Sequence, residues 1–388
     1  MFEKLLVLST SAGAGHVHAA EALVDAVRRH GAAREVDHVD MLDYTNRLFQ
    51  GIYRKLYLEI VDSAPDVFGW LYEATDNSSQ SRKRRLAFEK LNTRPFVKML
   101  EQRRPDLVVC THFLPAEIIS WLREQKRLDC PQAVVMTDFD LHAMWLCRHC
   151  EHYFTHLEET AVHLSAVGVP RERITVSGIP IDRRFGEALD RAKLRERLGL
   201  DPERTTLLLS TGGFGVGPVE RIVSDLLEMG RPAELLVVSG RNAELADWLD
   251  ARAAEQPSNP RVRLHPFGFV RNMHELMAAS DLIIGKPGGL TTAEALASGL
   301  VFVIMNPVPG QEERNADHLL EENAAIRCNN LPALRWKVEQ LLSEPERLER
   351  MRSNARRLAR PDAADVIVKK LLELNPGQIA EPIGGPWP

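Results

Sequence analysis

Short apolar runs alternate along the chain with stretches in which apolar residues recur at helical spacing. In the first half, these runs predict strands at 5–9, 106–110, 133–137 and 152–156. In the second half, they predict strands at 206–210, 234–240, 261–267, 281–285 and 301–305. Short apolar runs separated by helices are typical of a parallel sheet covered on both faces. Because the pattern occurs in both halves, we expect an α/β protein with two doubly wound, Rossmann-like domains.

The domain boundary is expected where Gly and Pro interrupt the pattern, in VSGIPIDRRF at 176–185. A chain of 388 residues also exceeds what one hydrophobic core usually serves. We therefore predict an N-terminal domain over 1–177 and a C-terminal domain over 178–360. Residues 361–388 are expected to form a helix and an irregular tail, with the option that they pack back on the N-terminal domain.

Charge and composition exclude several classes of protein. A net charge of −5 argues against a general nucleic-acid binder. No run approaches the ~20 apolar residues of a spanning helix. The apolar part of the N-terminal MFEKLLVLST is too short for a signal peptide, so a cytoplasmic protein is expected.

The five cysteines do not suggest a disulfide framework. Cys147 and Cys150 form a single CxxC with His142, His149 and His152 nearby. A zinc site needs a second ligand pair at regular spacing, which the sequence lacks, so no metal is expected. The alternative to a metal site is a pair of reduced thiols near a domain surface.

Two glycine-rich turns in the second half each join a predicted strand to a helix. STGGFGVGP (210–218) precedes a helix near Val219, and GKPGGLTTAEALASG (285–299) precedes a helix over about 291–298 that Gly299 ends. Backbone N–H groups at such helix starts can bind a phosphate. Lys286 and Arg241 are candidate cations for a diphosphate. The alternatives are tight structural turns and solvated surface charges.

Polar side chains near the second turn suit a hydroxyl-rich ligand. Glu294 has two readings: it completes a capping box with Thr291, or its carboxylate accepts the hydroxyls of a ribose. Gln311, Glu312 and Asn315 follow a Pro-Gly turn after the next strand, either as ligand contacts or as an ordinary polar helix start.

His16 follows the first strand in SAGAGHVHAAEAL, at the start of a predicted helix. A helix N-terminus disfavours imidazolium, so the basic neutral ring should be available near neutral pH. The apolar spacing of the helix predicts rigid docking through Ala19, Ala22, Leu23, Ala26 and Val27. His16 is therefore either a general base or a structural histidine bonded to a loop carbonyl.

These stretches, with TDFDLHAMW (137–145), VSGIPID (176–182) and PGQEERNA (309–316), resemble the monogalactosyldiacylglycerol synthase family within glycosyltransferase family 28. Its bacterial relatives include processive diacylglycerol glucosyltransferases. The resemblance implies a GT-B fold, in which two Rossmann-like domains face a central cleft. It also implies an inverting mechanism, a UDP-sugar in the C-terminal domain and no bound metal. This chain has G-A-G-H where the motif of the plant enzymes is G-G-G-H. For this reason the resemblance is not used to infer a preference for galactose.

The resemblance also implies roles for individual residues. His16 falls on the proposed base, with Asp138 as an alternative base or an orienting partner. Separately from the resemblance, we predict that Gly15, His142 and Trp145 lie on the acceptor side. The phosphate loops fall on Gly212, Gly213, Gly288 and Gly289, the uracil loop on Phe269, and the ribose contact on Glu294. The contacts to the donor sugar fall on Gln311 and Glu312. The other residues predicted to bind the donor are Gly215, Val270, Leu290, Thr291 and the cations Arg241 and Lys286.

A lipid acceptor requires contact with a membrane. The segment 47–61 has a helical face that includes Phe49 and Tyr53, and Trp70 follows it. Four cations come next, at Arg82, Lys83, Arg84 and Arg85. Aromatic residues beside cations suit binding to an anionic lipid surface. The alternative is an amphipathic core helix followed by a solvated charge run. Together with the resemblance, this segment predicts a peripheral protein on the inner face of the cell membrane.

The expected reaction moves glucose or galactose from UDP-glucose or UDP-galactose to the 3-hydroxyl of diacylglycerol, giving a β-glycosyldiacylglycerol. Processive addition of further sugars is left open. One alternative is another lipid acceptor, such as a polyprenyl-linked sugar or a sterol-like lipid. A Rossmann-type oxidoreductase is disfavoured because the first strand lacks G-x-G-x-x-G and Asp37 and Asp40 are imperfectly placed for its ribose acid. A third alternative is a non-catalytic lipid- or nucleotide-binding protein.

Overall fold

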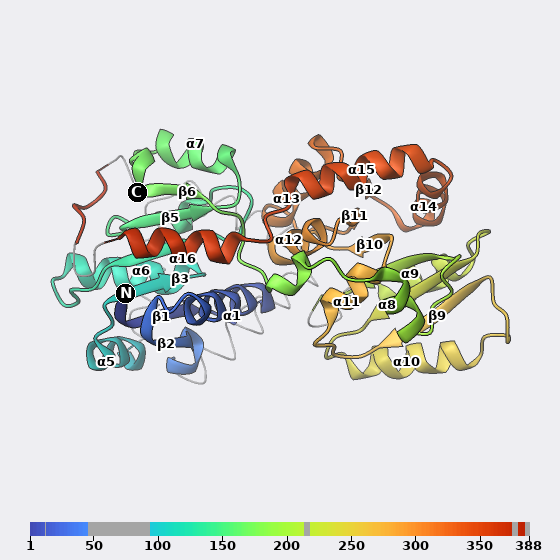
Figure 1. Cartoon of the computed structure of the whole chain (residues 1–388), viewed down its shortest axis with the longest axis horizontal. Helices are drawn as coiled ribbons and strands as arrows, with labels where there is room; N and C mark the ends of the chain where they lie inside the picture. Colours follow the sequence, from blue (N-terminus) through green and yellow to red (C-terminus); the bar gives the residue numbers. More distant parts are fainter. Residues whose placement is uncertain (12, 46–93, 213–217, 375–378, 385–388) are drawn as a thin grey trace. The chain divides into compact units, whose positions relative to one another are not determined.

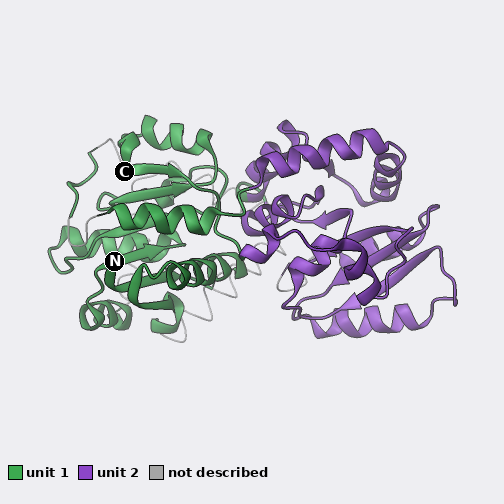
Figure 2. Cartoon of the chain, in the orientation of Figure 1, with its two compact units in different colours: residues 1–182, 309–311, 360–388 green, residues 183–308, 312–359 purple. Residues whose placement is uncertain are grey.

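A computed structural model of the chain describes residues 1–11, 13–45, 94–212, 218–374 and 379–384. The chain forms two compact units (Figure 2). The first contains Met1–Asp182, Pro309–Gln311 and Arg360–Pro388, and the second contains Arg183–Val308 and Glu312–Ala359. The chain leaves the first unit after Asp182, within the Gly- and Pro-containing stretch 176–185, contributes Pro309–Gln311 to it, and returns to it at Arg360.

The first unit is built on a parallel sheet with the strand order β2-β1-β3-β4-β5-β6 (Figure 1). The strands are β1 (Phe2–Ser9), β2 (Ala33–Asp40), β3 (Leu107–Cys110), β4 (Gln132–Val135), β5 (His152–Thr155) and β6 (Ile174–Val176). The helices described in this unit are α1 (Ala14–Arg29), α5 (Arg94–Arg103), α6 (Phe113–Glu124), α7 (Glu158–Ala166) and α16 (Ala363–Glu373), with 3₁₀ turns η1 (Met41–Tyr44), η2 (Ala143–Trp145) and η3 (Arg171–Arg173).

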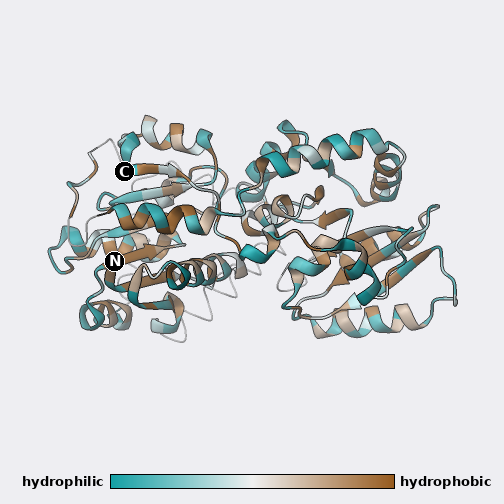
Figure 3. Cartoon of the chain, viewed as in Figure 1, coloured by the Kyte–Doolittle hydropathy of each residue, from teal (hydrophilic) through white to brown (hydrophobic). Residues whose placement is uncertain are grey.

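Both faces of the inner part of this sheet are buried, which is why its inner strands are largely apolar without alternation. Leu5 and Val7 of β1 lie in a cluster with residues of α1 and α16. Leu6 and Leu8 of the same strand point to the other face, into a cluster with residues of α5 and α6. Figure 3 shows the apolar strands in brown between helices whose outer faces are largely hydrophilic.

Helix α16 joins the first unit although it comes last along the chain. Ile367, Val368 and Leu371 are buried in the same cluster as Leu23 and Val27 of α1. The apolar face of α16 therefore covers part of the first sheet, which contains β1.

The second unit has a parallel sheet with the strand order β12-β11-β10-β7-β8-β9. The strands are β7 (Thr205–Ser210), β8 (Ala233–Val238), β9 (Val262–Phe267), β10 (Leu282–Gly285), β11 (Val301–Met305) and β12 (Ala325–Cys328). The helices described are α8 (Arg191–Arg197), α9 (Val219–Leu227), α10 (Ala243–Ala254), α11 (Met273–Ala279), α12 (Gly289–Ala297), α13 (Gln311–Glu321), α14 (Leu334–Leu342) and α15 (Pro345–Leu358), with 3₁₀ turns η4 (Arg183–Gly186) and η5 (Leu331–Ala333).

The second sheet is also apolar on both faces. Leu207 and Leu209 of β7 lie in a cluster with Val223 of α9 and Leu249 of α10. Leu208 between them is buried as well. Because parallel strands end at the same edge, the turns after β7 and β10 lie at one edge of this sheet.

Every strand predicted from an apolar run is present, while β2, β6 and β12 were not predicted. All three lie at sheet edges. Strand β2, for example, reads AREVDHVD and is mostly exposed or half-buried. The helix predicted over about 291–298 begins earlier, at Gly289, and Gly299 follows its end with a φ of +68° as expected of a C-terminal glycine.

Candidate functional site

His16 lies in the first turn of α1, just after the end of β1. Gly13 caps this helix in an extended conformation, without a side-chain cap. The Nδ1 of His16 lies 3.0 Å from the carbonyl oxygen of Thr111 and 2.9 Å from Oγ1 of Thr137. A carbonyl oxygen can only accept a hydrogen bond, so Nδ1 carries the proton of the neutral ring. Nε2 is then left with a lone pair that can accept a proton.

The surroundings of His16 keep this ring neutral. Loss of hydration on burial lowers its pKa below the ordinary 6.5, while the Asp138 carboxylate and the Thr111 carbonyl partly oppose that effect. The net direction is downward. At neutral pH the imidazole is therefore mainly in its basic form, as a general base requires.

Two loops at the carboxyl edge of the first sheet hold His16 in place. Thr111 follows β3 and Thr137 follows β4. Oγ1 of Thr111 also donates to the backbone oxygens of His16, at 2.8 Å, and Leu8, at 3.3 Å. The ring of His112 makes an edge contact with the His16 ring, with centroids 4.5 Å apart. The orientation of His16 is thus set by the loops that follow two neighbouring strands, β3 and β4.

Asp138 is buried beside this histidine. Its carboxylate accepts a hydrogen bond from Nε1 of Trp145 at 2.8 Å and another from Nε2 of Gln311. The sequence did not predict that Trp145 and Gln311 would both donate hydrogen bonds to Asp138. This placement suits an orienting and electrostatic partner of His16.

The expectation that His142 and Trp145 line an acceptor surface is wrong. Each is only 1% exposed. The ring Nδ1 of His142 accepts from the backbone N–H of Met144 at 3.2 Å, and Trp145 is held by Asp138. The His142 side chain caps the start of η2, and the Trp145 side chain is buried at its end. Gly15 is half-buried within the first turn of α1.

The two thiols of the CxxC are also not near a surface. Cys147 and Cys150 belong to the hydrophobic core of the first unit. Burial raises the pKa of the Cys150 thiol well above its usual range, so the thiol stays protonated. No group of three or more His, Cys, Asp or Glu side chains among the described residues is arranged to hold a metal ion.

In the second unit, the predicted phosphate loops follow β7 and β10. Gly212 has a φ of +71°, a conformation that favours glycine, and Oγ1 of Thr211 ties this turn to the Val238 carbonyl at 2.7 Å. Gly213 and Gly215 lie outside the described residues. At the end of β10, a Cβ on Gly285 would lie 2.6 Å from the Ser210 carbonyl oxygen. The two strands therefore end in close contact.

The N-terminus of α12 lies in the glycine-rich turn predicted to bind a phosphate. Gly288 is its N-cap and makes no side-chain cap. Gly289, Leu290 and Thr291 are the first three residues of the helix, where N–H groups lack intrahelical acceptors. Thr291 lies inside the helix, so the capping box with Glu294 is wrong. The ribose reading of Glu294 remains a prediction.

Glu312 faces this helix start. A Cβ on Gly288 would lie 3.6 Å from its Oε1. Its Oε2 accepts from the N–H of Val308 at 2.7 Å. Burial raises the pKa of Glu312, partly opposed by that hydrogen bond and by Lys286. Nearby, Nδ2 of the buried Asn315 donates to the Pro287 carbonyl at 2.9 Å and anchors α13 to the loop before α12.

Arg241 and Phe269, two predicted donor contacts far apart in sequence, lie side by side. The Arg241 guanidinium lies 5.1 Å from the centroid of the Phe269 ring. That ring is 52% exposed, and Val270 after it is half-buried. An exposed aromatic ring beside a cation provides a surface on which a planar base can stack.

The predicted membrane segment lies outside the described residues. This applies to Phe49, Tyr53, Trp70, Arg82, Lys83, Arg84 and Arg85. Among the residues that are described, no helix is long and apolar enough to cross a membrane.

Comparison with known proteins agrees with this arrangement. Residues 16–181 match the monogalactosyldiacylglycerol (MGDG) synthase family, and residues 221–358 match the glycosyl transferases group 1. The processive diacylglycerol beta-glucosyltransferase of Staphylococcus carnosus is 30% identical over 319 residues, covering 81% of this chain and 78% of the relative. The protein of the same name from Bacillus licheniformis is 28% identical over 371 residues, covering 96% and 95%.

Solved structures show the same fold at lower identity. MurG of Acinetobacter baumannii superposes with a TM-score of 0.63 at 17% identity, covering 96% of this chain and all of that one. Alr3699/HepE of Anabaena, in complex with UDP-glucose, gives 0.56 at 15% identity with similar coverage. Two Rossmann-like units of the GT-B type, with these relatives, place the protein: the chain belongs to the glycosyltransferase family of the monogalactosyldiacylglycerol synthases and the processive diacylglycerol β-glucosyltransferases.

Proposed function

We propose that this protein transfers glucose from UDP-glucose to the 3-hydroxyl of diacylglycerol, with inversion, to give β-glucosyldiacylglycerol. The acceptor and the sugar follow from the names of the relatives, which are diacylglycerol beta-glucosyltransferases. The observation that carries the mechanism is the contact of His16 Nδ1 with the Thr111 carbonyl, because it leaves Nε2 as the proton acceptor.

In the proposed step, Nε2 of His16 takes the proton of the acceptor hydroxyl. The acceptor oxygen attacks C1 of the glucose as the bond from C1 to the diphosphate oxygen breaks. UDP leaves with that electron pair from the opposite face, which gives the inverted linkage. Asp138 stabilises the imidazolium that forms, because a carboxylate close to a charged ring favours the charged form.

The donor is assigned to the second unit. The N–H groups of Gly289, Leu290 and Thr291 and the Lys286 ammonium would meet the diphosphate, a pairing that needs no metal. Phe269 and Arg241 provide the stacking surface for uracil. Glu294 would bind the ribose, and Glu312 would bind hydroxyls of the sugar; we also assign Gln311 to the sugar.

We further propose that the protein binds the inner face of the cell membrane peripherally. The support lies in the aromatic residues and cations of 47–85 and in the lipid that appears in the names of the relatives. Attraction between cations and an anionic surface would add on the order of 1 kcal/mol for each Lys or Arg near it.

The test is a turnover assay of the full chain with diacylglycerol in anionic liposomes. UDP-glucose and UDP-galactose are supplied in separate reactions and the glycolipid is separated by thin-layer chromatography. We expect product from UDP-glucose, and a loss of about 10²–10⁴-fold in the His16→Ala variant. Full activity of that variant would reject His16 as the base. Absence of product with either sugar, with UDP still bound, would reject the acceptor.

A further inference from the structure

The second unit contains a cationic cavity away from the predicted donor residues. Its volume is about 210 Å³. Several of the residues that line it have ionisable side chains: Arg184, Arg191, His274, Arg352, Arg356 and Glu187. This lining is dominated by guanidinium groups, which suit oxyanions because their N–H groups match the oxygens of a phosphoryl group.

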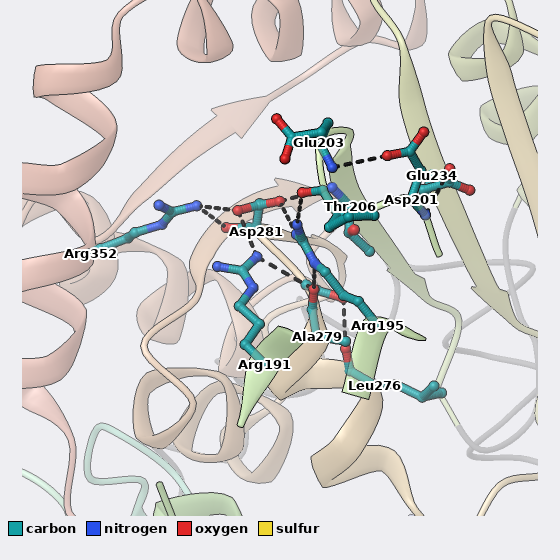
Figure 4. A network of polar contacts seen from close by, with 12 residues as sticks. Arg191, Arg195, Asp201, Glu203, Thr206, Glu234, Leu276, Ala279, Asp281 and Arg352 are labelled. Atoms are coloured by element: carbon teal, nitrogen blue, oxygen red, sulfur yellow. Dashed lines mark hydrogen bonds and ion pairs between the residues drawn. The ribbon is translucent and has the colours of Figure 1, made fainter. Parts of the chain in front are cut away.

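Asp281 binds two of the arginines that line this cavity, and a third arginine next to them (Figure 4). It accepts from Nη2 of Arg191 at 2.6 Å, of Arg195 at 2.7 Å and of Arg352 at 2.7 Å. The backbone N–H of Thr206 adds a fourth bond at 2.8 Å. Burial tends to raise the pKa of Asp281, but these partners outweigh it, so the carboxylate stays ionised. One negative charge thus holds three positive charges.

The carboxylates nearby do not cancel this excess. Glu349 lies 3.1 Å from Nη1 of Arg356 and 3.6 Å from Nη1 of Arg352, but its side chain is 58% exposed. Glu187 also pairs with Arg183, at 3.3 Å. Arg191, Arg352 and Arg356, with Arg195 behind them, therefore outnumber Asp281 and Glu349 by two. Arg195 and Arg352 are only 10% and 18% exposed, so their charge is weakly screened by solvent.

The cavity lies at the opposite edge of the sheet from the phosphate loops. Asp281 comes just before β10, whereas Gly285 ends that strand. Four residues of strand separate the two edges by about 13 Å. Ala297, Ser298 and Gly299 at the end of α12 form another wall of the cavity. In this last turn, the carbonyls of Leu296 and Ala295 accept from the N–H groups of Gly299 and Leu300.

We propose that this cavity is a second anion site of the protein, which binds a phosphoryl group through Arg184, Arg191, Arg352 and Arg356. The ligand class is a phosphate or a phosphate monoester. Its source is either free phosphate or the headgroup of an acidic phospholipid. The site does not depend on which sugar or acceptor the enzyme uses.

The test measures binding of inorganic phosphate by calorimetry at constant ionic strength, with the donor residues saturated by UDP and again without UDP. Arg356→Ala is the main variant and Arg357→Ala its control. The two arginines are neighbours on α15, their side chains are equally exposed at 59%, and each has a carboxylate partner, but only Arg356 lines the cavity. Arg184→Ala is the second cavity variant, and thermal midpoints establish that all variants are folded.

We expect phosphate to bind wild type whether UDP is present or not. Arg356→Ala and Arg184→Ala should each weaken binding by about fivefold or more, and Arg357→Ala by less than about twofold. Repeating the titration with a short-chain phosphatidate below its micelle concentration identifies the source: tighter binding of phosphatidate through Arg356 points to a lipid headgroup, and equal or weaker binding points to free phosphate. No binding of either probe, or binding unaffected by both cavity variants, would overturn the proposal.

Discussion

The Nδ1 of His16 lies 3.0 Å from the carbonyl oxygen of Thr111, and this contact decides which ring nitrogen can take a proton. The base form is the neutral ring, which is lost as pH falls through the pKa of His16. Burial lowers that pKa, so kcat/KM should fall only below the ordinary histidine value of 6.5. The measurement is kcat/KM from pH 4.5 to 8 at a fixed lipid composition.

Asp138 supplies the control for this assignment. Its carboxylate raises the pKa of His16, so Asp138→Asn should move the acid limb to still lower pH, and it should also slow turnover. The asparagine side-chain oxygen can still accept from Trp145. An acid limb that moved upward in this variant would assign the limb to another group.

Trp145→Phe should destabilise the first unit. The change removes the Nε1 donor of the buried Asp138 carboxylate and leaves unfilled space in the core. We expect a loss of about 2–4 kcal/mol in the free energy of unfolding, together with reduced kcat. Trp336→Phe on α14, where the side chain is 60% exposed, is the matched control and should stay within about 0.5 kcal/mol. Equal effects in urea titrations would contradict the assignment.

Gly285→Ala tests the close contact between β10 and β7. The new Cβ would lie 2.6 Å from the Ser210 carbonyl oxygen, so backbone must shift to admit it. Strain of this kind costs about 1–3 kcal/mol, and it should lower the Tm and weaken UDP binding. Gly268→Ala, whose Cβ would meet nothing within 4 Å, should leave the Tm nearly unchanged. A Gly285→Ala variant as stable as wild type would refute the predicted strain.

His152 is expected to make the first unit acid-sensitive. Burial and the nearby Lys370 lower its pKa to about 4, with Glu373 opposing them. Between pH 6.5 and 4 the unfolded chain binds a proton there and the folded chain does not, so stability falls as pH falls. The loss attributable to this group reaches about 3 kcal/mol near pH 4.

His152→Gln should remove that part of the pH dependence, because glutamine can keep the hydrogen bond to Oγ1 of Thr175 without titrating. Unfolding free energies at pH 7, 6, 5 and 4 measure it. Parallel curves for the variant and wild type would show that another group is responsible.

Chelation provides a further test of the proposed donor site. The N–H groups of α12 and Lys286 are assigned to the diphosphate, so turnover should not need a metal. EDTA at about 5 mM, in excess over any metal, should therefore leave the turnover rate within about twofold. Lys286→Ala should instead raise KM for UDP-glucose by about tenfold, and Lys286→Arg should restore part of that loss. If chelation abolished turnover and added Mg²⁺ restored it, the mechanism would require a metal.

Apolar runs predicted the interior of both sheets, because strands buried on two faces need continuous apolar sequence. Apolar runs did not predict the edge strands β2, β6 and β12, because part of their surface faces solvent or because they are short. Sequence also could not place Trp145: an aromatic residue beside a motif can either meet a ligand or fill the core. Only the packing of η2 against Asp138 distinguished the two.

The capping box at Thr291 failed for a related reason. The spacing of Thr291 and Glu294 fits a helix start, but glycines before it allow the helix to begin at Gly289. His16 was predicted at a helix start and lies at one, because small residues and a glycine before an apolar helical pattern define such a turn closely. Its partners Thr111 and Thr137 come from distant strands and gave no local signal.

The return of α16 to the first unit has a consequence for how the protein is made. During translation, the first sheet emerges with the face of Leu5 and Val7 missing the cover that Ile367, Val368 and Leu371 provide. The second unit, nearly continuous from Arg183 to Ala359, is synthesised in between. At ribosomal rates this delay is roughly 10–40 seconds. The unit that contains His16 is thus begun first and completed last, and nascent chains should depend on chaperones at that face of its sheet until α16 arrives.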